Sequence, residues 1–311
     1  MSFFLNGGIM KAQDFKDTAH VVHEIGRTIE SKMVEYLFDQ TKDKDVLKEL
    51  SRFQNKDGGF GHGLEPDCWN PNSSPIQTQF AMGYLRLITF NKKHQVIKKM
   101  MKYLETTYDK KLRKWHLLIP SNHDYPHAPW WNYREIEEDY NPSASIAGFI
   151  IKYGNPRSKS YRYALEVADD VMADIINDNI TKEPHELSCI IDLYDDVNHI
   201  FQSDQKFQAS KIKLIKIIGD VIEKDHKKWF TSYVTKPSVL IHSKTSIGYE
   251  TYQDLLKTEL SESLNYRNDL KIWPVTWSWT DYLDVFEEAK EIWSSIIALK
   301  YLYLLKDDLK E

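Results

Sequence analysis

The sequence predicts an all-α protein, built as a single α/α toroid in which inner and outer helices alternate around a central cavity. Apolar residues recur at helical spacing along most of the 311-residue chain, and strand-like alternation is almost absent. About eleven or twelve helical segments follow one another in pairs, as a toroid requires. No linker rich in Pro, Gly or Ser divides residues 1–311, so we expect one domain.

Each helix is predicted from its apolar stripe and from the residues that end it. Thr18–Leu37 places Val, Ile, Met and Leu on one face, and Val46–Phe53 ends before the Gly58–Gly59 turn. The next helix begins near Ser74, which Pro75 follows. The helices from there on are predicted over Pro75–Thr89, His94–Thr107, Pro142–Tyr153, Tyr161–Ile176, Glu183–Phe201, Ala209–Ile222, Thr251–Leu260, Leu283–Lys290 and Glu291–Leu305.

Composition excludes several classes of protein. The chain is 41% hydrophobic and 28% charged, its apolar stretches are short, and we expect no transmembrane segment. Both charge signs are interspersed around a formal net charge of −5, so we expect no nucleic-acid partner. Met1–Met10 lacks a basic region and a cleavage site, so we expect no signal peptide. Two cysteines form no disulfide framework, which favours the cytoplasm.

The segment Gln54–Gly61 (QNKDGGFG) and the helix start Ser74–Thr78 (SPIQT) form the most informative motif. Together they resemble the glutamine/aromatic repeat of squalene–hopene cyclases and protein prenyltransferase β-subunits. The resemblance covers about 35 residues and implies the α/α toroid of the terpenoid cyclase and prenyltransferase superfamily more strongly than it implies a reaction. Similar aromatic loops precede later helices at Trp115–Asn141, Trp229–Tyr249 and Trp273–Asp284, and in a toroid such loops gather at one end.

The first candidate site lies between the two halves of this motif, in the run HGLEPDCW. Glu65 and Asp67 are the candidate catalytic acids, because Pro66 restrains a backbone that can aim both into a cavity. His62 and Trp69 are candidate substrate-binding residues beside them. The structural alternative is a solvated loop whose acids cap the following helix.

The second and third candidates are aromatic loops. Residues 122–141 combine large rings, amides and carboxylates, which suits either sugar rings or an isoprenoid chain. In the run Trp273–Tyr282, alternation places the tryptophans on one side, and packing is the alternative reading. These loops supply the candidate catalytic residues Asp139 and Asp281 and the candidate binding residues His127, Trp130, Trp131, Tyr140, Asn141, Trp277 and Trp279.

Metal chemistry is not favoured by the sequence. Asp192, Asp195 and Asp196 share a helix face and could hold magnesium, but their order is the reverse of that in class I prenyl-transferring enzymes. We therefore interpret them as a solvated helix face. The adjacent Asp67 and Cys68 break the zinc pattern of protein prenyltransferases, so we expect neither zinc nor another cofactor.

The resemblance implies an isoprenoid-handling enzyme of the transferase or cyclase type, although its Asp-x-Asp-Asp motif is absent from this chain. Two alternatives stay open. The first is a glycoside hydrolase or lyase, with Glu65 or Asp67 opposite Asp139 or Asp281 at about 6.5–9.5 Å if it inverts. The second is a non-catalytic ligand-binding toroid. No arginine cluster accompanies the aromatic loops, which favours a neutral or cationic small molecule or an oligosaccharide over a diphosphate, and no obligate protein partner is evident.

Overall fold

The computed structural model describes residues 10–135, 139–306 and 309–310, and within them the prediction of an all-α protein is confirmed. Two-residue strands β1 (Met10–Lys11) and β2 (Leu309–Lys310) pair in parallel. The part of Met1–Met10 before residue 10, on which the expectation of no signal peptide rests, lies outside the described residues. The helices are α1 (Ala12–Ile25), α2 (Thr28–Leu37), α3 (Asp43–Leu50), α4 (Pro75–Arg86), α5 (Gln95–Thr107), α6 (Ser143–Tyr153), α7 (Lys159–Ile176), α8 (Pro184–Val197), α9 (Gln205–Val221), α10 (Pro237–Leu240), α11 (Tyr249–Ser263) and α12 (Leu283–Leu305).

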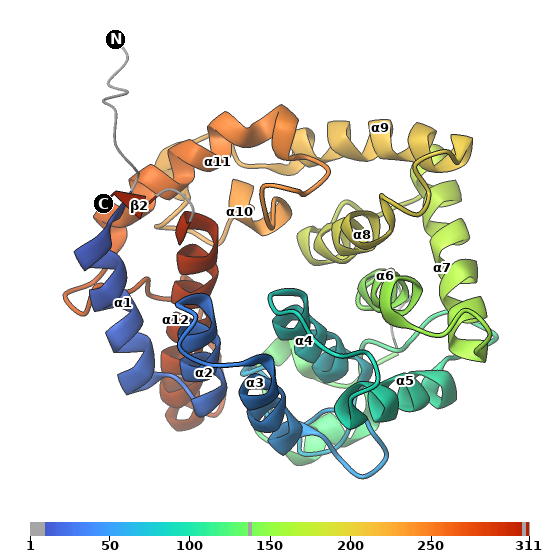
Figure 1. Ribbon diagram of the computed structural model, residues 1–311, viewed down its shortest axis with the longest axis horizontal. Coiled ribbons are helices and arrows are strands. Elements are labelled where there is room, and N and C mark those ends of the chain that lie inside the picture. Colours follow the sequence, from blue (N-terminus) through green and yellow to red (C-terminus); the bar gives the residue numbers. More distant parts are fainter. Residues whose placement is uncertain (1–9, 136–138, 307–308, 311) are drawn as a thin grey trace.

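The helices follow one another around a ring (Figure 1). Helices α1, α5, α7, α9 and α11 lie on its perimeter, whereas α4, α6, α8 and α10 lie nearer its centre. Helix α6 packs against α7 and α8, and α8 packs against α9 and α10. The two ends of the chain meet, because α1 packs against α12 and β1 pairs with β2. No helix among the described residues has the length and apolarity that crossing a membrane demands.

The predicted division of the chain into helices is wrong in two places. Thr18–Leu37 is two helices, because Gly26 and Arg27 are extended, with ψ of 162° and 165°. The break is held by Arg27, whose backbone N–H donates to the Glu30 carboxylate and whose guanidinium donates to the carbonyl of Gly63, 2.7 Å away. In the other direction, the predicted helices Leu283–Lys290 and Glu291–Leu305 form one continuous helix, α12.

Two predicted helix starts coincide with a capping side chain in the structure. Ser74 caps α4 by accepting from the N–H of Gln77 at 3.2 Å, with Pro75 in the first turn. Glu183 caps α8 by accepting from two backbone N–H groups. Helix α9 begins four residues before the predicted Ala209, because Asp204 caps it instead. The four-residue helix α10 was not predicted.

Buried apolar side chains form a main core that runs through the helices and a second, smaller core. We call the second one the loop-end core, since most of it comes from the loops before α4, α6 and α12. It consists of Cys68, Ile76, Leu118, Ala128, Trp131, Trp279, Phe286 and Ala289, with Trp69, Leu117, Val275, Trp277 and Val285 packed against it. Three loops that are distant in sequence therefore meet at the N-terminal ends of α4 and α12.

Gly83 is a mid-helix glycine with no packing role. It is exposed on α4, and a Cβ at this position would meet no atom within 4 Å. We expect Gly83→Ala to raise the free energy of unfolding by about 1 kcal/mol, because alanine favours the helix more than glycine does. Denaturant titration measures this change.

Gly148 on α6 provides the matched control. A Cβ there would lie 2.7 Å from the Cα of Leu193 on α8, so Gly148→Ala should destabilise the protein. Equal losses of stability in both variants would show that the space beside Gly83 is filled.

Candidate active site

The residues of the glutamine/aromatic motif build a scaffold around the loop that carries the candidate acids. The side-chain amide of Gln54 donates to the carbonyls of Gly58 and Val96, at 3.0 and 2.9 Å. Asp57 accepts from the N–H of Gly59 and from the hydroxyl of Ser73. These bonds tie the turn to α5 and to the far end of the loop. The matching residues therefore have structural roles.

Gly58 is required by its surroundings. Its φ is +98°, and a Cβ on it would lie 2.2 Å from the carbonyl oxygen of Lys99. A side chain would therefore be both strained and in collision with the backbone of α5. The glycine allows the turn to pack directly on that helix.

Gln77 in the first turn of α4 positions the two acids. Its side-chain oxygen accepts from the N–H of Glu65 at 2.8 Å, and its amide donates to the carbonyls of Cys68 at 2.9 Å and Glu65 at 3.3 Å. The segment from Glu65 to Cys68 is thereby bound to the helix start by one side chain. Gln77 is a positioning residue for the acids.

The second aromatic loop pairs with the acid loop through its backbone. Ala128 N–H donates to the carbonyl of Asp67 at 2.8 Å, and Trp69 N–H donates to that of Pro126 at 2.9 Å. The third loop reaches the same place from the C-terminal part of the chain, where the indole N–H of Trp279 donates to the Asp67 carboxylate at 2.9 Å. All three candidate loops thus converge on Asp67.

Both acids are buried, with exposed fractions of 5% for Glu65 and 4% for Asp67. Burial, with the nearby charge of Asp67, raises the pKa of Glu65 well above its usual range. Burial also raises the pKa of Asp67 to about 6, although the indole N–H groups of Trp279, Trp293 and Trp277 oppose this shift. One oxygen of Glu65, Oε2, has no hydrogen-bond partner among the described residues.

Tryptophans surround the two acids, and we call Trp131, Trp277, Trp279 and Trp293 the indole cluster. Trp277 packs edge-on against Trp293 with ring centroids 5.4 Å apart, and Trp293 packs edge-on against Phe80 of α4 at 5.7 Å. The indole nitrogens of Trp131, Trp277 and Trp293 are buried and lack an acceptor within the described part of the chain.

Sequence reasoning missed Trp293. This residue lies in the predicted helix Glu291–Leu305, and the sequence gives it no predicted role. Helix α12 is continuous and carries Trp293 on the side that faces Trp277. The sequence does contain one indication of its role. Trp293 is a large aromatic residue ten positions after the start of a helix that directly follows the third loop.

Other predicted residues lie outside this cluster. His62 is exposed and its Nε2 bonds the side chain of Asn55, 2.9 Å away. Trp130 is 40% exposed, and Asp281 is exposed and accepts from the hydroxyl of Thr280. Trp69 belongs to the loop-end core, but its indole donates to the carbonyl of Pro66. The polar groups of His62 and Asp281 therefore bond elsewhere, whereas the Trp69 indole bonds the main chain between the two acids and not their carboxyl groups.

His127 is buried, and both of its ring nitrogens have a hydrogen-bond partner. Nδ1 lies 2.6 Å from the carbonyl of Tyr125, and Nε2 lies 2.8 Å from the side-chain oxygen of Asn132. Both partners belong to the same loop, so the imidazole ring stabilises the conformation of that loop.

The end of the second loop forms a separate polar group near α8. Burial raises the pKa of Asp139 to about 6, against the N–H of Asn141, which donates to it at 2.8 Å. Tyr140 donates its N–H to the Glu186 carboxylate. Asn141 accepts from the thiol of Cys189, 3.5 Å away. Residues 136–138, which include two of the loop's glutamates, lie outside the described residues.

The interpretation of the α8 aspartates as a solvated face is wrong. Asp196 is buried and its carboxylate lies 2.9 Å from Arg86 and 2.8 Å from Lys152. Asp192 accepts from Ser145 at 2.7 Å and pairs with His242 at 3.1 Å. The face is turned toward α4, α6 and the residues after α10, where cations neutralise it. Within the described ranges, no three His, Cys, Asp or Glu side chains are placed to hold a metal ion.

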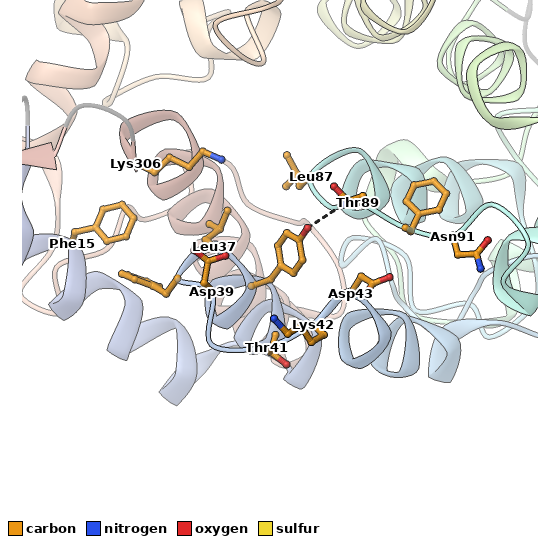
Figure 2. Close-up of a pocket in the computed structure, with 13 residues that line it drawn as sticks. Phe15, Leu37, Asp39, Thr41, Lys42, Asp43, Leu87, Thr89, Asn91 and Lys306 are labelled. Carbon is orange, nitrogen blue, oxygen red and sulfur yellow. Dashed lines mark hydrogen bonds between the residues drawn. The ribbon is translucent and has the colours of Figure 1, made fainter.

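A cleft of about 830 Å³ lies at the opposite ends of α4 and α12 (Figure 2). Leu37, Phe38, Leu87 and Phe90 give it apolar walls, and Lys42, Asp39 and Lys306 add charge. Tyr36 accepts through its hydroxyl from the N–H of Thr89 across the cleft. None of the predicted site residues lines it.

Comparison of the chain with protein-family models, with curated proteins and with solved structures finds no match. The candidate site must therefore be interpreted from its own geometry.

Proposed function

We propose that the protein is an enzyme of the α/α toroid type, similar to terpenoid cyclases and prenyltransferases, and that Glu65 and Asp67 are its acid–base pair. The ring of helices in Figure 1 supports the toroid. The observation that carries the catalytic part is the buried, unpartnered oxygen of Glu65 beside a second buried carboxyl group. An acid retained for structure would have its hydrogen-bonding capacity satisfied, since leaving a buried polar group unpaired is costly.

The two carboxyl groups differ in protonation, which gives the pair complementary roles. Burial and the Asp67 charge raise the pKa of Glu65 well above its usual range, so Glu65 keeps its proton to a higher pH than an exposed glutamate does. Asp67 is ionised above pH 6, where the indole N–H of Trp279 stabilises its charge. Glu65 can then donate a proton to a bound ligand while Asp67 accepts one or stabilises a developing positive charge.

The surroundings suit a neutral or cationic ligand held against aromatic faces. The rings of the indole cluster offer π-faces to an apolar or cationic group. The buried free thiols of Cys68 and Cys189 support a reducing compartment, and we place the protein in the cytoplasm on that ground.

The pH dependence of turnover tests this assignment. We expect activity to rise as Asp67 ionises with a pKa of about 6, and to fall at higher pH as Glu65 loses its proton. Mass-spectrometric turnover assays with squalene, geranylgeranyl diphosphate and neutral tetrasaccharides, run from pH 4 to 10, measure the profile. A rate independent of pH between 5 and 7 would rule Asp67 out as the base.

A further inference from the structure

Three hydrogen-bond donors in the indole cluster have no acceptor among the described residues. The N–H groups belong to Trp131, Trp277 and Trp293, and the Trp131 side chain is more than nine-tenths buried. Buried tryptophan N–H groups ordinarily find a partner. In this protein others do so, since the indoles of Trp115 and Trp229 donate to backbone carbonyls at 2.9 Å. The unpaired donors are therefore concentrated beside the acids.

The acid pair also contains a hydrogen-bond acceptor that lacks a donor. Glu65 Oε2 is buried without a donor, and the Trp131 N–H lies close enough to the Glu65 carboxyl to influence its charge without reaching hydrogen-bond geometry. The N–H groups of Trp277 and Trp293 likewise lie close enough to the Asp67 carboxyl to lower its pKa without reaching hydrogen-bond geometry. Each carboxyl group thus has beside it an indole N–H that lowers the pKa of that carboxyl without meeting the geometry of a full hydrogen bond.

A hydroxyl group is chemically complementary to such a donor and such an acceptor, because it accepts from an indole N–H and donates to a carboxyl oxygen. A hydrocarbon does neither and would bury all of these groups unpaired. Beyond the acids, the Tyr233 ring packs edge-on against Trp277, and its hydroxyl lies 2.8 Å from His185 Nε2. Polar groups next to aromatic rings are therefore also found beyond the two carboxyl groups.

We propose that the ligand of this site is a hydroxyl-bearing ring compound of the carbohydrate class, whose hydroxyls bridge the indole N–H groups and the Glu65 and Asp67 carboxyls. This inference rests on the proposed function and deepens it. It differs from the isoprenoid substrate that the sequence resemblance implies. The faces of the aromatic rings would contact the apolar faces of the sugar. The indole N–H groups would donate hydrogen bonds to its hydroxyls.

Calorimetric titration with cellotetraose, xylotetraose, mannotetraose and maltotetraose, and with squalene in detergent, tests the ligand class. We expect at least one tetrasaccharide to bind saturably. Trp277→Phe and Trp131→Phe keep an aromatic ring and remove the donor, so each should weaken that binding about tenfold. Trp229→Phe removes a buried indole whose N–H is already bonded elsewhere and should leave affinity unchanged.

The outcomes separate the ligand class from the catalytic assignment. Saturable binding of squalene alone, or of none of these compounds, overturns the carbohydrate class, as does tetrasaccharide affinity that is equal in Trp277→Phe and wild type. If a tetrasaccharide binds and the donor variants weaken it, the class stands. Undiminished turnover of that sugar by Asp67→Asn would then refute the acid–base role alone.

Discussion

Replacing either acid by its amide should lower turnover strongly and leave the fold intact. Glu65→Gln and Asp67→Asn keep the shape of each side chain and remove its ability to exchange a proton, so we expect rates about 10²–10⁴-fold lower. Gln77 still holds the backbone of the loop, because its three bonds go to main-chain atoms. Circular dichroism and turnover of each variant measure the two expectations.

The contribution of Asp67 to the free energy of unfolding should be opposite in sign to that of an acid that stabilises the fold. The raised pKa of Asp67 means that the folded protein binds more protons than the unfolded chain between about pH 4 and 6. The contribution of Asp67 to stability therefore falls as pH rises through that window. Asp67→Asn should remove this dependence and raise the melting temperature at pH 7.

Glu287→Gln serves as the control, since Glu287 is exposed on α12 and pairs only with Lys290 within the described chain. It should change neither stability nor turnover appreciably. A lowered melting temperature in Asp67→Asn, with turnover retained, would make the acid a structural one.

Removing Arg86 should destabilise the protein by about 3–5 kcal/mol, because it leaves the buried carboxylate of Asp196 and the largely buried one of Asp192 without their shared guanidinium. Its guanidinium bonds Asp196 at 2.9 Å, lies 3.3 Å from Asp192 and donates to the carbonyl of Ser145 at 2.8 Å. The Asp192 pKa lies well below its usual range despite burial, chiefly because of Arg86 and His242. Denaturant unfolding of Arg86→Met measures the loss.

Arg113→Met is the matched control for this cluster. Arg113 also pairs with an aspartate, Asp170 at 2.8 Å, but both side chains are substantially exposed. Its removal should cost less than about 1 kcal/mol. Similar losses in the two arginine variants would contradict a buried, mutually dependent charge cluster around α8.

The parts of the fold that depend on local sequence were predictable. Apolar periodicity located most helices, and Ser74 and Glu183 marked the starts of α4 and α8 because capping acts within three residues. The break at Gly26 was not predicted, because the local bond between Arg27 and Glu30 is supported by a second bond from Arg27 to Gly63 in another segment. Conversely, nothing local separates residues 290 and 291, and the helix runs through them.

The candidate site was predictable as a set of loops but not as a geometry. The acids and the tryptophans are visible in the sequence, yet the bond between Trp279 and Asp67 joins residues 212 positions apart. The α8 aspartates show the same limit. Their spacing indicates a shared face, and only the packing of α8 against α6, α9 and α10 shows that this face is buried.

The most direct test of the acid pair is a ¹³C NMR titration of the carboxyl groups, with Glu65→Gln and Asp67→Asn used to assign the two signals. We predict that the Asp67 carboxyl titrates with a pKa of about 6 and that the Glu65 carboxyl keeps its proton to a pH well above the range of ordinary glutamates. Each pKa should shift when its partner is neutralised. If both groups titrate near pH 4, as exposed carboxyls do, the acids are solvated and the proposed acid–base site does not exist.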